Sequence, residues 1–240
     1  GETRQIPFSV NDTRTAYPAV EVAVDVAPDT LTTAMPRFAT QSPDGQSVIF
    51  ESMGRLYVKR SDTEAKRLTR DTSDAVEFSP AFSPDGKDVY YLTWSDDALG
   101  SVRKVSARGG RPQNVLATPG HYVDLSVSSD GETLLFAKLS GSALTNPHWG
   151  NKPGIYTFNI GDDEAQFVSR RGRSPHFGPE DRIYANERAS SAVGRGSDDA
   201  STELISMNHD GEDVRTHASS PLATVIRMSP VGNHVAYRAA

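Results

Sequence analysis

The sequence of 240 residues contains no cysteine, no long apolar run and no basic tract. Without cysteine, the chain can form neither a disulfide bond nor a thiolate metal site. No stretch reaches the roughly 18 consecutive apolar residues that a transmembrane helix needs, so we expect no membrane span. The net charge of −6, with no cluster of Lys and Arg, argues against a nucleic-acid partner.

The common catalytic motifs are also missing. No serine lies in a Gly-x-Ser-x-Gly motif, and the six histidines include no His-x-His pair. Adjacent carboxylates such as Asp96 and Asp97 point in different directions, which suits solvated turns better than a cation site. We therefore predict no catalytic residue, no metal ligands and no cofactor, and the sequence leaves open whether the chain is an enzyme. The histidines are His121, His148, His176, His209, His217 and His234.

A turn between two strands is the most informative feature that is present. In Phe82–Gly86, Pro84 fixes a backbone angle suited to a type I turn, and Asp85 can bond to its own local backbone. Gly86 can take the positive φ that closes the hairpin without a Cβ clash. The strand that follows, Asp88–Trp94, is apolar on both faces, so we expect it to be covered on both sides.

This turn recurs along the chain. Its copies begin at residues 42, 83, 128, 178 and 229, so successive starts are 41, 45, 50 and 51 residues apart. A period of about 40–50 residues with several short strands is typical of propeller blades. We predict an all-β protein, a β-propeller of four-stranded blades with about five to six blades. The turn residues that carry the prediction are Pro43, Asp44, Gly45, Pro84, Asp85, Gly86, Asp130 and Gly131.

The blades are expected near residues 37–69, 80–117, 123–169, 174–217 and 224–240, within a repeat region of residues 34–240. Residues 1–33 lack the turn but hold two strand candidates, Gln5–Val10 and Val20–Val26. We predict that they supply the missing outer strands of the last blade and so close the propeller, which removes an exposed edge. Two alternatives stay open: an N-terminal extension, and a piece of a longer propeller.

Turns of the form Ser-Pro-Asp-Gly before an apolar strand resemble the TolB-like, tricorn-like propeller repeat. Some stretches are similar to the propeller portion of bacterial exported amidohydrolases, which carry a metal-dependent barrel downstream. That resemblance implies a periplasmic or secreted location, and we expect that any signal peptide lies outside this sequence. Three turns depart from the motif, at Ser129, at Glu180-Asp181 and at Val231. The stretches are 4–8, 99–105, 119–123, 153–156 and 174–177.

Long loops gather on the face of the propeller opposite these turns, and function usually lies on such loops. Aromatic side chains beside arginine favour contact with a protein or peptide, although the tryptophans could equally pack the loops onto the blades. We predict a binding site at the rim and channel mouth, made of Trp94, His121, Tyr122, His148, Trp149, Arg171, Arg173 and His176.

Two functions are compatible with these features. The first is a non-catalytic propeller module that binds or gates a protein or substrate, as part of a larger amidohydrolase-like hydrolase. Its partner would be a protein, a peptide or a downstream catalytic domain. The alternative is a propeller enzyme, a lyase or hydrolase, with a site built on His121, His148 and His176. A cluster of these histidines within ligand distance would favour the enzyme.

Overall fold

The computed structural model describes residues 3–17, 32–70, 73–140, 152–189 and 201–239. The chain divides into two units, Gly1–Thr32 and Thr33–Ala240. In the first unit, residues 3–17 form no strand, and Ile6, Phe8 and Val10 are 78%, 86% and 77% exposed. The predicted strand Gln5–Val10 is therefore wrong, because alternating apolar residues do not form a strand without a pairing partner and Pro7 has no N–H to donate. The other candidate, Val20–Val26, lies outside the described residues, and closure by residues 1–33 stays a prediction.

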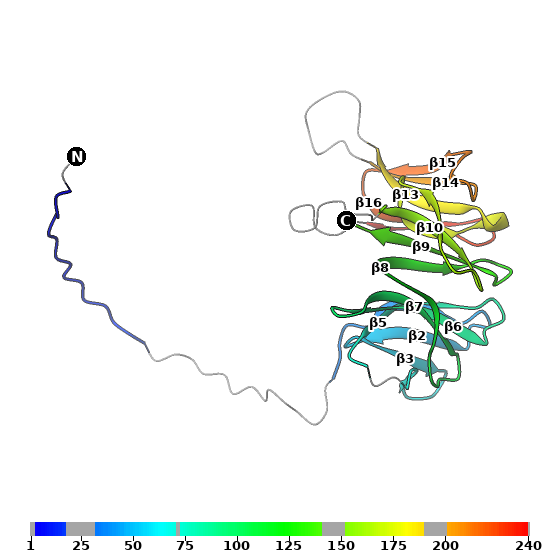
Figure 1. Cartoon of the computed structure of the whole chain (residues 1–240), viewed down its shortest axis with the longest axis horizontal. Helices are drawn as coiled ribbons and strands as arrows, with labels where there is room; N and C mark the ends of the chain where they lie inside the picture. Colours follow the sequence, from blue (N-terminus) through cyan, green and yellow to red (C-terminus); the bar gives the residue numbers. More distant parts are fainter. Residues whose placement is uncertain (1–2, 18–31, 71–72, 141–151, 190–200, 240) are drawn as a thin grey trace. The chain divides into compact units, whose positions relative to one another are not determined.

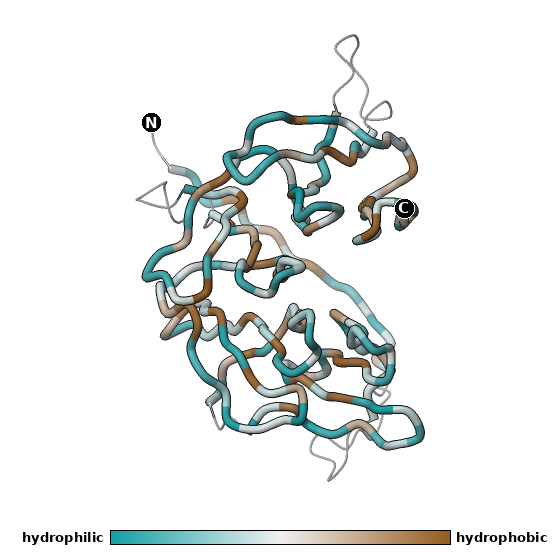
Figure 2. The backbone as a smooth tube through the Cα atoms, turned by 90° about the vertical axis from the view of Figure 1, so that its right-hand side faces the viewer, coloured by the Kyte–Doolittle hydropathy of each residue, from teal (hydrophilic) through white to brown (hydrophobic). Residues whose placement is uncertain are grey.

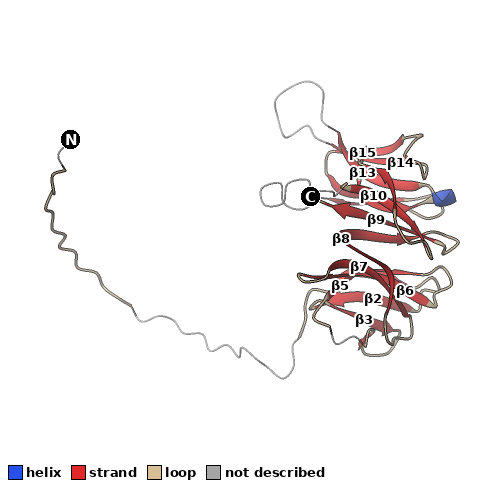
Figure 3. Cartoon of the chain, viewed as in Figure 1, coloured by secondary structure: helices blue, strands red, loops and turns tan. Residues whose placement is uncertain are grey.

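The second unit is built almost entirely of strands, with one 3₁₀ turn, η1 (Pro179–Asp181), in its described part (Figures 1 and 3). The all-β prediction is confirmed. The strands are β1 (Arg37–Gln41), β2 (Ser47–Ser52), β3 (Arg55–Arg60), β4 (Lys66–Arg67), β5 (Val76–Phe82), β6 (Asp88–Ser95), β7 (Leu99–Ser106), β8 (Gln113–Val127), β9 (Thr133–Leu139), β10 (Gly154–Asn159), β11 (Gln166–Ser169), β12 (Arg173–Phe177), β13 (Ile183–Ala189), β14 (Ser201–Met207), β15 (Arg215–Ser220), β16 (Ala223–Met228) and β17 (Val235–Ala239).

These strands form antiparallel sheets in which strands that follow one another in the sequence pair with each other. The orders are β1-β2-β3-β4, then β5 to β11 in one seven-stranded sheet, then β12-β13-β14-β15, and last β16-β17. The strands do not begin and end where the predicted blades do. For example, β5 begins at Val76, whereas the second blade is expected to begin near residue 80, and the last strand of the first sheet is only Lys66–Arg67.

The seven-stranded sheet exists because β8 is one long strand. Its first part pairs with β7 as far as Gly120, opposite Gly100, and its second part pairs with β9 from His121 onward. The predicted blades leave a break here, between residues 117 and 123. The chain instead stays extended through Gly120, where a Cβ on Gly100 would lie 2.2 Å from the Gly120 carbonyl oxygen, so only glycine permits this approach.

The repeated turns share one hydrogen-bond pattern. In the second turn the Ser83 hydroxyl donates to Asp85 (2.7 Å) and accepts from the backbone N–H of Asp88, while the Asp85 carboxylate also accepts from the N–H of Lys87. Gly86 has φ of +69° and its N–H donates to the carbonyl of Ser83, as predicted. The turns that begin at Ser42 and Ser128 repeat these bonds.

Successive turns also stack on one another. A Cβ on Gly86 would lie 3.6 Å from the Pro43 ring, one on Gly131 would lie 3.2 Å from Pro84, and one on Gly232 would lie 2.7 Å from Pro179. Between the turns that begin at residues 128 and 178 this contact is absent, because Ser129 stands in place of the proline and Asp181 in place of the glycine. There the Asp181 carboxylate accepts bonds from the backbone N–H (2.7 Å) and hydroxyl (2.6 Å) of Ser129. The departures from the motif at Ser129 and Asp181 thus compensate each other.

The first strand of each sheet repeat carries a β-bulge. The bulged residue has positive φ and lies four positions before its turn: Phe38 (+51°), Ser79 (+51°), Asp124 (+57°) and Ser174 (+51°). Bulges leave ladder N–H groups unpaired. Backbone N–H groups of three of these first strands donate to side chains of the preceding bulged strand: Leu125 to the Ser79 hydroxyl (3.3 Å), Phe177 to the Ser126 hydroxyl (3.4 Å) and Met228 to Nε2 of His176 (3.0 Å).

The core lies between neighbouring sheets. In β6, Tyr90 and Leu92 belong to one buried cluster, with Phe136 and Phe158, whereas Val89 and Tyr91 belong to another, with Ile49 and Leu56. The prediction that this strand is covered on both faces is confirmed. In Figure 2, hydrophobic segments of the backbone (brown) are separated by hydrophilic ones (teal).

The last sheet is the most exposed. Every described residue of β17 is exposed, with Tyr237 at 66% and Val235 at 44%, and among the described residues β17 pairs only with β16. Two hydrogen bonds between Asn186 and the backbone of Ile226 hold this sheet to β13. Within the described part of the chain, none of the helical structure is long and apolar enough to cross a membrane.

Candidate functional site

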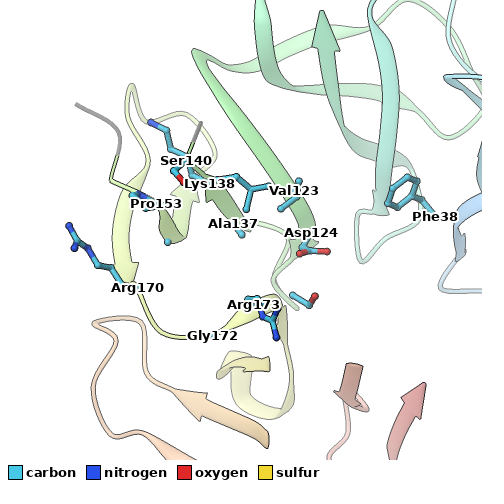
Figure 4. Close-up of a pocket in the computed structure, with 13 residues that line it drawn as sticks. Phe38, Val123, Asp124, Ala137, Lys138, Ser140, Pro153, Arg170, Gly172 and Arg173 are labelled. Atoms are coloured by element: carbon cyan, nitrogen blue, oxygen red, sulfur yellow. The ribbon is translucent and has the colours of Figure 1, made fainter. Parts of the chain in front are cut away.

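A cavity of about 690 Å³ opens at the bulged strands, away from the turns (Figure 4). Three of the four left-handed bulge residues, Phe38, Asp124 and Ser174, line it. The rest of the wall comes from β8, β9, the start of β10, the residues that flank β9 and β10, the link between β11 and β12, and the first residue of β12. The lining residues are Phe38, Val123, Asp124, Ala137, Lys138, Leu139, Ser140, Pro153, Gly154, Arg170, Gly172, Arg173 and Ser174.

The charges of the cavity are unequal. Lys138, Arg170 and Arg173 line it, against a single carboxylate, Asp124. Among the described residues, none of these three cations forms an ion pair, and the ammonium of Lys138 lies 5.9 Å from the centre of the Tyr156 ring. Figure 4 shows Lys138 and Arg170 at the rim of the cavity. The cavity is therefore a candidate site for an anionic group.

Asp124 is held in a partly buried position. Its burial raises the pKa of its carboxyl above the ordinary value, while the charge of Arg227 and hydrogen bonds from Ser174 act in the opposite direction. Even when it is ionised, Asp124 is one carboxylate against three cations. The electrostatics of the cavity favour a negatively charged guest.

His176, predicted as a site residue, is part of the scaffold. It is 5% exposed and its Nε2 accepts the backbone N–H of Met228. Burial, followed by the charge of Arg227, lowers the pKa of this imidazole to about 4, so it stays neutral. A neutral ring with an occupied Nε2 links β12 to β16.

Trp94 and His121 meet each other away from the cavity wall. Their rings lie 4.9 Å apart at 45°, and the indole Nε1–H of Trp94 donates to Asp96 (3.1 Å). Tyr122 is only 3% exposed and packs edge-on against Phe136, while its hydroxyl donates to the Thr118 carbonyl (2.8 Å). Burial raises the pKa of Tyr122 to about 12.

Of the two predicted arginines, only Arg173 reaches the cavity. Arg171 instead forms two hydrogen bonds with Glu187, at 3.1 and 2.6 Å. His148 and Trp149 lie outside the described residues. The structure therefore gathers Arg173 with residues that the sequence did not single out, namely Phe38, Asp124, Lys138 and Arg170. The spacing of four residues before each turn could have indicated Phe38 and Asp124.

Within the described residues, no group of three His, Asp or Glu side chains is arranged to hold a metal ion. His121 contacts Trp94, and His176 is buried against Met228. The two described members of the proposed histidine site therefore have separate structural roles.

Sheets that curl around repeated turns, with β-bulges on the first strand of each repeat, define a TolB-like β-propeller fold. Solved structures with this fold include a candidate TolB from Agrobacterium tumefaciens, at 18% identity and a TM-score of 0.54, covering 85% of this chain and 80% of the other. An oligogalacturonate lyase from Vibrio parahaemolyticus matches at 18% identity and a TM-score of 0.56, covering 82% and 56%. A chain of the nidogen/laminin complex matches at 16% identity and 0.57, covering 80% and 69%.

No protein-family model matches the chain, and no curated protein matches it in sequence. At these identities the structural likeness establishes the fold alone. The chain spans about half the length of the lyase, so that enzyme's activity does not transfer with the fold.

Proposed function

We propose that this chain is a non-catalytic propeller module that binds a peptide or protein segment in the cavity at the bulged strands. The observation that supports this most is the cavity itself. Its volume of about 690 Å³ lies within the range of ligand sites, and it combines apolar walls with a few charged groups. It also lies on a rigid scaffold that the stacked turns and strand-to-strand bonds hold in place.

The fold does not choose between binding and catalysis, since a TolB and a lyase share it. The side chains favour binding, because the described histidines are engaged in packing and the cavity presents arginine and lysine. The nidogen/laminin structure is an example of this fold in a protein complex, which supports a protein partner for this chain.

Several finer features belong to the same proposal. We count the seven-stranded sheet as two four-stranded blades that share β8, which yields four complete blades and the β16-β17 pair. The module would work in the periplasm or outside the cell, as part of a larger hydrolase. The similarity of short stretches to exported amidohydrolases supports that association.

Peptide selection tests the proposal. A random peptide library would be selected on the intact chain, and the affinity of the enriched peptides measured by calorimetry. Ser140→Trp fills the cavity rim, and Ser61→Trp places the same bulk on an exposed turn far along the chain as a matched control. We expect Ser140→Trp to weaken binding about tenfold or more and Ser61→Trp to leave it unchanged. Enriched peptides that bind both variants equally well would overturn the proposal.

A further inference from the structure

Three cations line the same cavity, and none of them has a counter-ion among the described residues. Several arginines elsewhere in the unit are matched: Arg37 pairs with Glu51 (2.7 Å), Arg171 with Glu187 (2.6 Å) and Arg182 with Asp213 (2.9 Å). In the described part of the chain, by contrast, Lys138, Arg170 and Arg173 form no ion pair. Residues 141–151, which follow Lys138 closely in sequence, contain no Asp or Glu. Unmatched cations that share one cavity favour an anionic guest.

The walls limit what that guest can be. Phe38 and Leu139 remain 48% and 40% exposed, and with Val123, Ala137 and Pro153 they give the cavity an apolar lining. Uncovered apolar area of this kind gains free energy when a ligand covers it. The guest therefore needs an apolar body as well as a charge.

Asp124 separates two kinds of anion. A doubly charged group such as phosphate would be brought close to this carboxylate, whose repulsion grows with the charge of the guest. A carboxylate carries one charge and is matched in shape by a planar guanidinium such as that of Arg173. The cavity thus fits a carboxylate better than a phosphate.

We infer that the cavity binds a ligand with one carboxylate and an apolar body, and that Arg173 holds the carboxylate while the charge of Lys138 at the rim adds to the attraction. This inference rests on the proposed function and specifies its ligand chemistry. The carboxylate has two sources, the C-terminus of a peptide with an apolar last residue and a free organic acid of similar shape. Both present the same chemistry to the cavity.

Three probes test the inference by calorimetry on the intact chain at low salt. They are the peptide Gly-Ser-Gly-Leu-Phe with a free carboxylate, the same peptide as its C-terminal amide, and 3-phenylpropionate. We expect the free acid to bind about tenfold more tightly than the amide, because the amide cannot form charge-assisted hydrogen bonds. This preference should shrink as salt rises above about 0.1 M. Binding of 3-phenylpropionate at a similar affinity would identify the free acid as sufficient.

Two charge-matched variants locate the effect. Lys138→Gln with Arg173→Gln removes two cations from the cavity, whereas Lys66→Gln with Arg108→Gln removes two exposed cations outside it. The first should lose the preference for acid over amide, and the second should keep it. Arg173→Lys alone retains the charge and should keep part of the preference for acid over amide. This result would show that the double variant loses the preference through lost charge and not through unfolding.

The outcomes separate the two proposals. Equal affinity for acid and amide, with both lost in Ser140→Trp, would overturn the carboxylate inference and leave the peptide-binding function standing. An equal loss in both double variants would show general electrostatic attraction and would also overturn the inference. Absence of binding by all three probes would overturn it too, and the library selection would then decide the proposed function by itself.

Discussion

The two ends of the bulged strands are built in opposite ways. At the turn end, the same residues recur in the same roles: Ser42, Ser83 and Ser128 each donate to an aspartate two residues later. At the cavity end, the same backbone position recurs with a different side chain at most copies, as Phe38, Ser79, Asp124 and Ser174. The turn end thus repeats because stacking requires it, whereas the cavity end is free to vary and can carry specificity.

A turn glycine gives the largest effect that tests this contrast. Gly131→Ala places a Cβ in a left-handed backbone position (φ +80°) and 3.2 Å from the Pro84 ring. Gly161→Ala is the control, since its φ is +111° but nothing lies within 4 Å. We expect Gly131→Ala to lower the free energy of unfolding by about 2 kcal/mol, and Gly161→Ala by about 1 kcal/mol. Chemical denaturation measures both, and equal losses would contradict the importance of stacking.

Lowering the pH gives the next largest effect on folding stability, with opposite signs for an aspartate at the turn end and one at the cavity end. Hydrogen bonds from the Ser128 hydroxyl and the Glu132 N–H lower the pKa of Asp130, so its stabilisation is present at neutral pH. That stabilisation is lost as the pH falls through the folded-state pKa, below the ordinary value of about 4. Burial raises the pKa of Asp124, so its ionised form instead opposes folding at neutral pH.

The measurement is the melting temperature of Asp130→Asn and Asp124→Asn from about pH 7 to about pH 3. Asp130→Asn should be less stable than the unmodified chain at neutral pH and approach it in acid. Asp124→Asn should be at least as stable at neutral pH and lose that advantage in acid. Two curves of the same sign would show that the two carboxylates are not in contrasting environments.

The sequence could predict the turn end well, because its chemistry is local. The Pro84-Asp85-Gly86 turn and its spacing can be recognised without knowledge of distant residues. The strand that follows has apolar residues on both faces, which predicts that both faces are buried. The continuous strand β8 could not be seen, since Pro119 and Gly120 usually interrupt strands and only pairing across to Gly100 keeps them extended. Lys138 and Arg170 belong to different strands and links, so only the tertiary structure brings them to one cavity.

The smallest effect is expected at a cavity bulge. Phe38 is 48% exposed and packs at 6.0 Å from the Phe78 ring. Phe38→Asn accepts the positive φ readily and loses only a partial apolar contact, so the unfolding free energy should change by no more than about 0.5–1 kcal/mol. Binding of an apolar ligand should weaken more than stability does. A stability loss as large as that of Gly131→Ala would mean that the cavity end is as constrained as the turns.

The shared strand β8 has a mechanical consequence. Its first part is bonded to β7 and its second part to β9, so one uninterrupted backbone joins the sheets on either side of Gly120. A pull on the chain that separates the two sides must load covalent bonds and two hydrogen-bond ladders at the same point. The middle of the array should therefore resist stretching most, and unravelling under force should begin at the two-stranded end formed by β16 and β17.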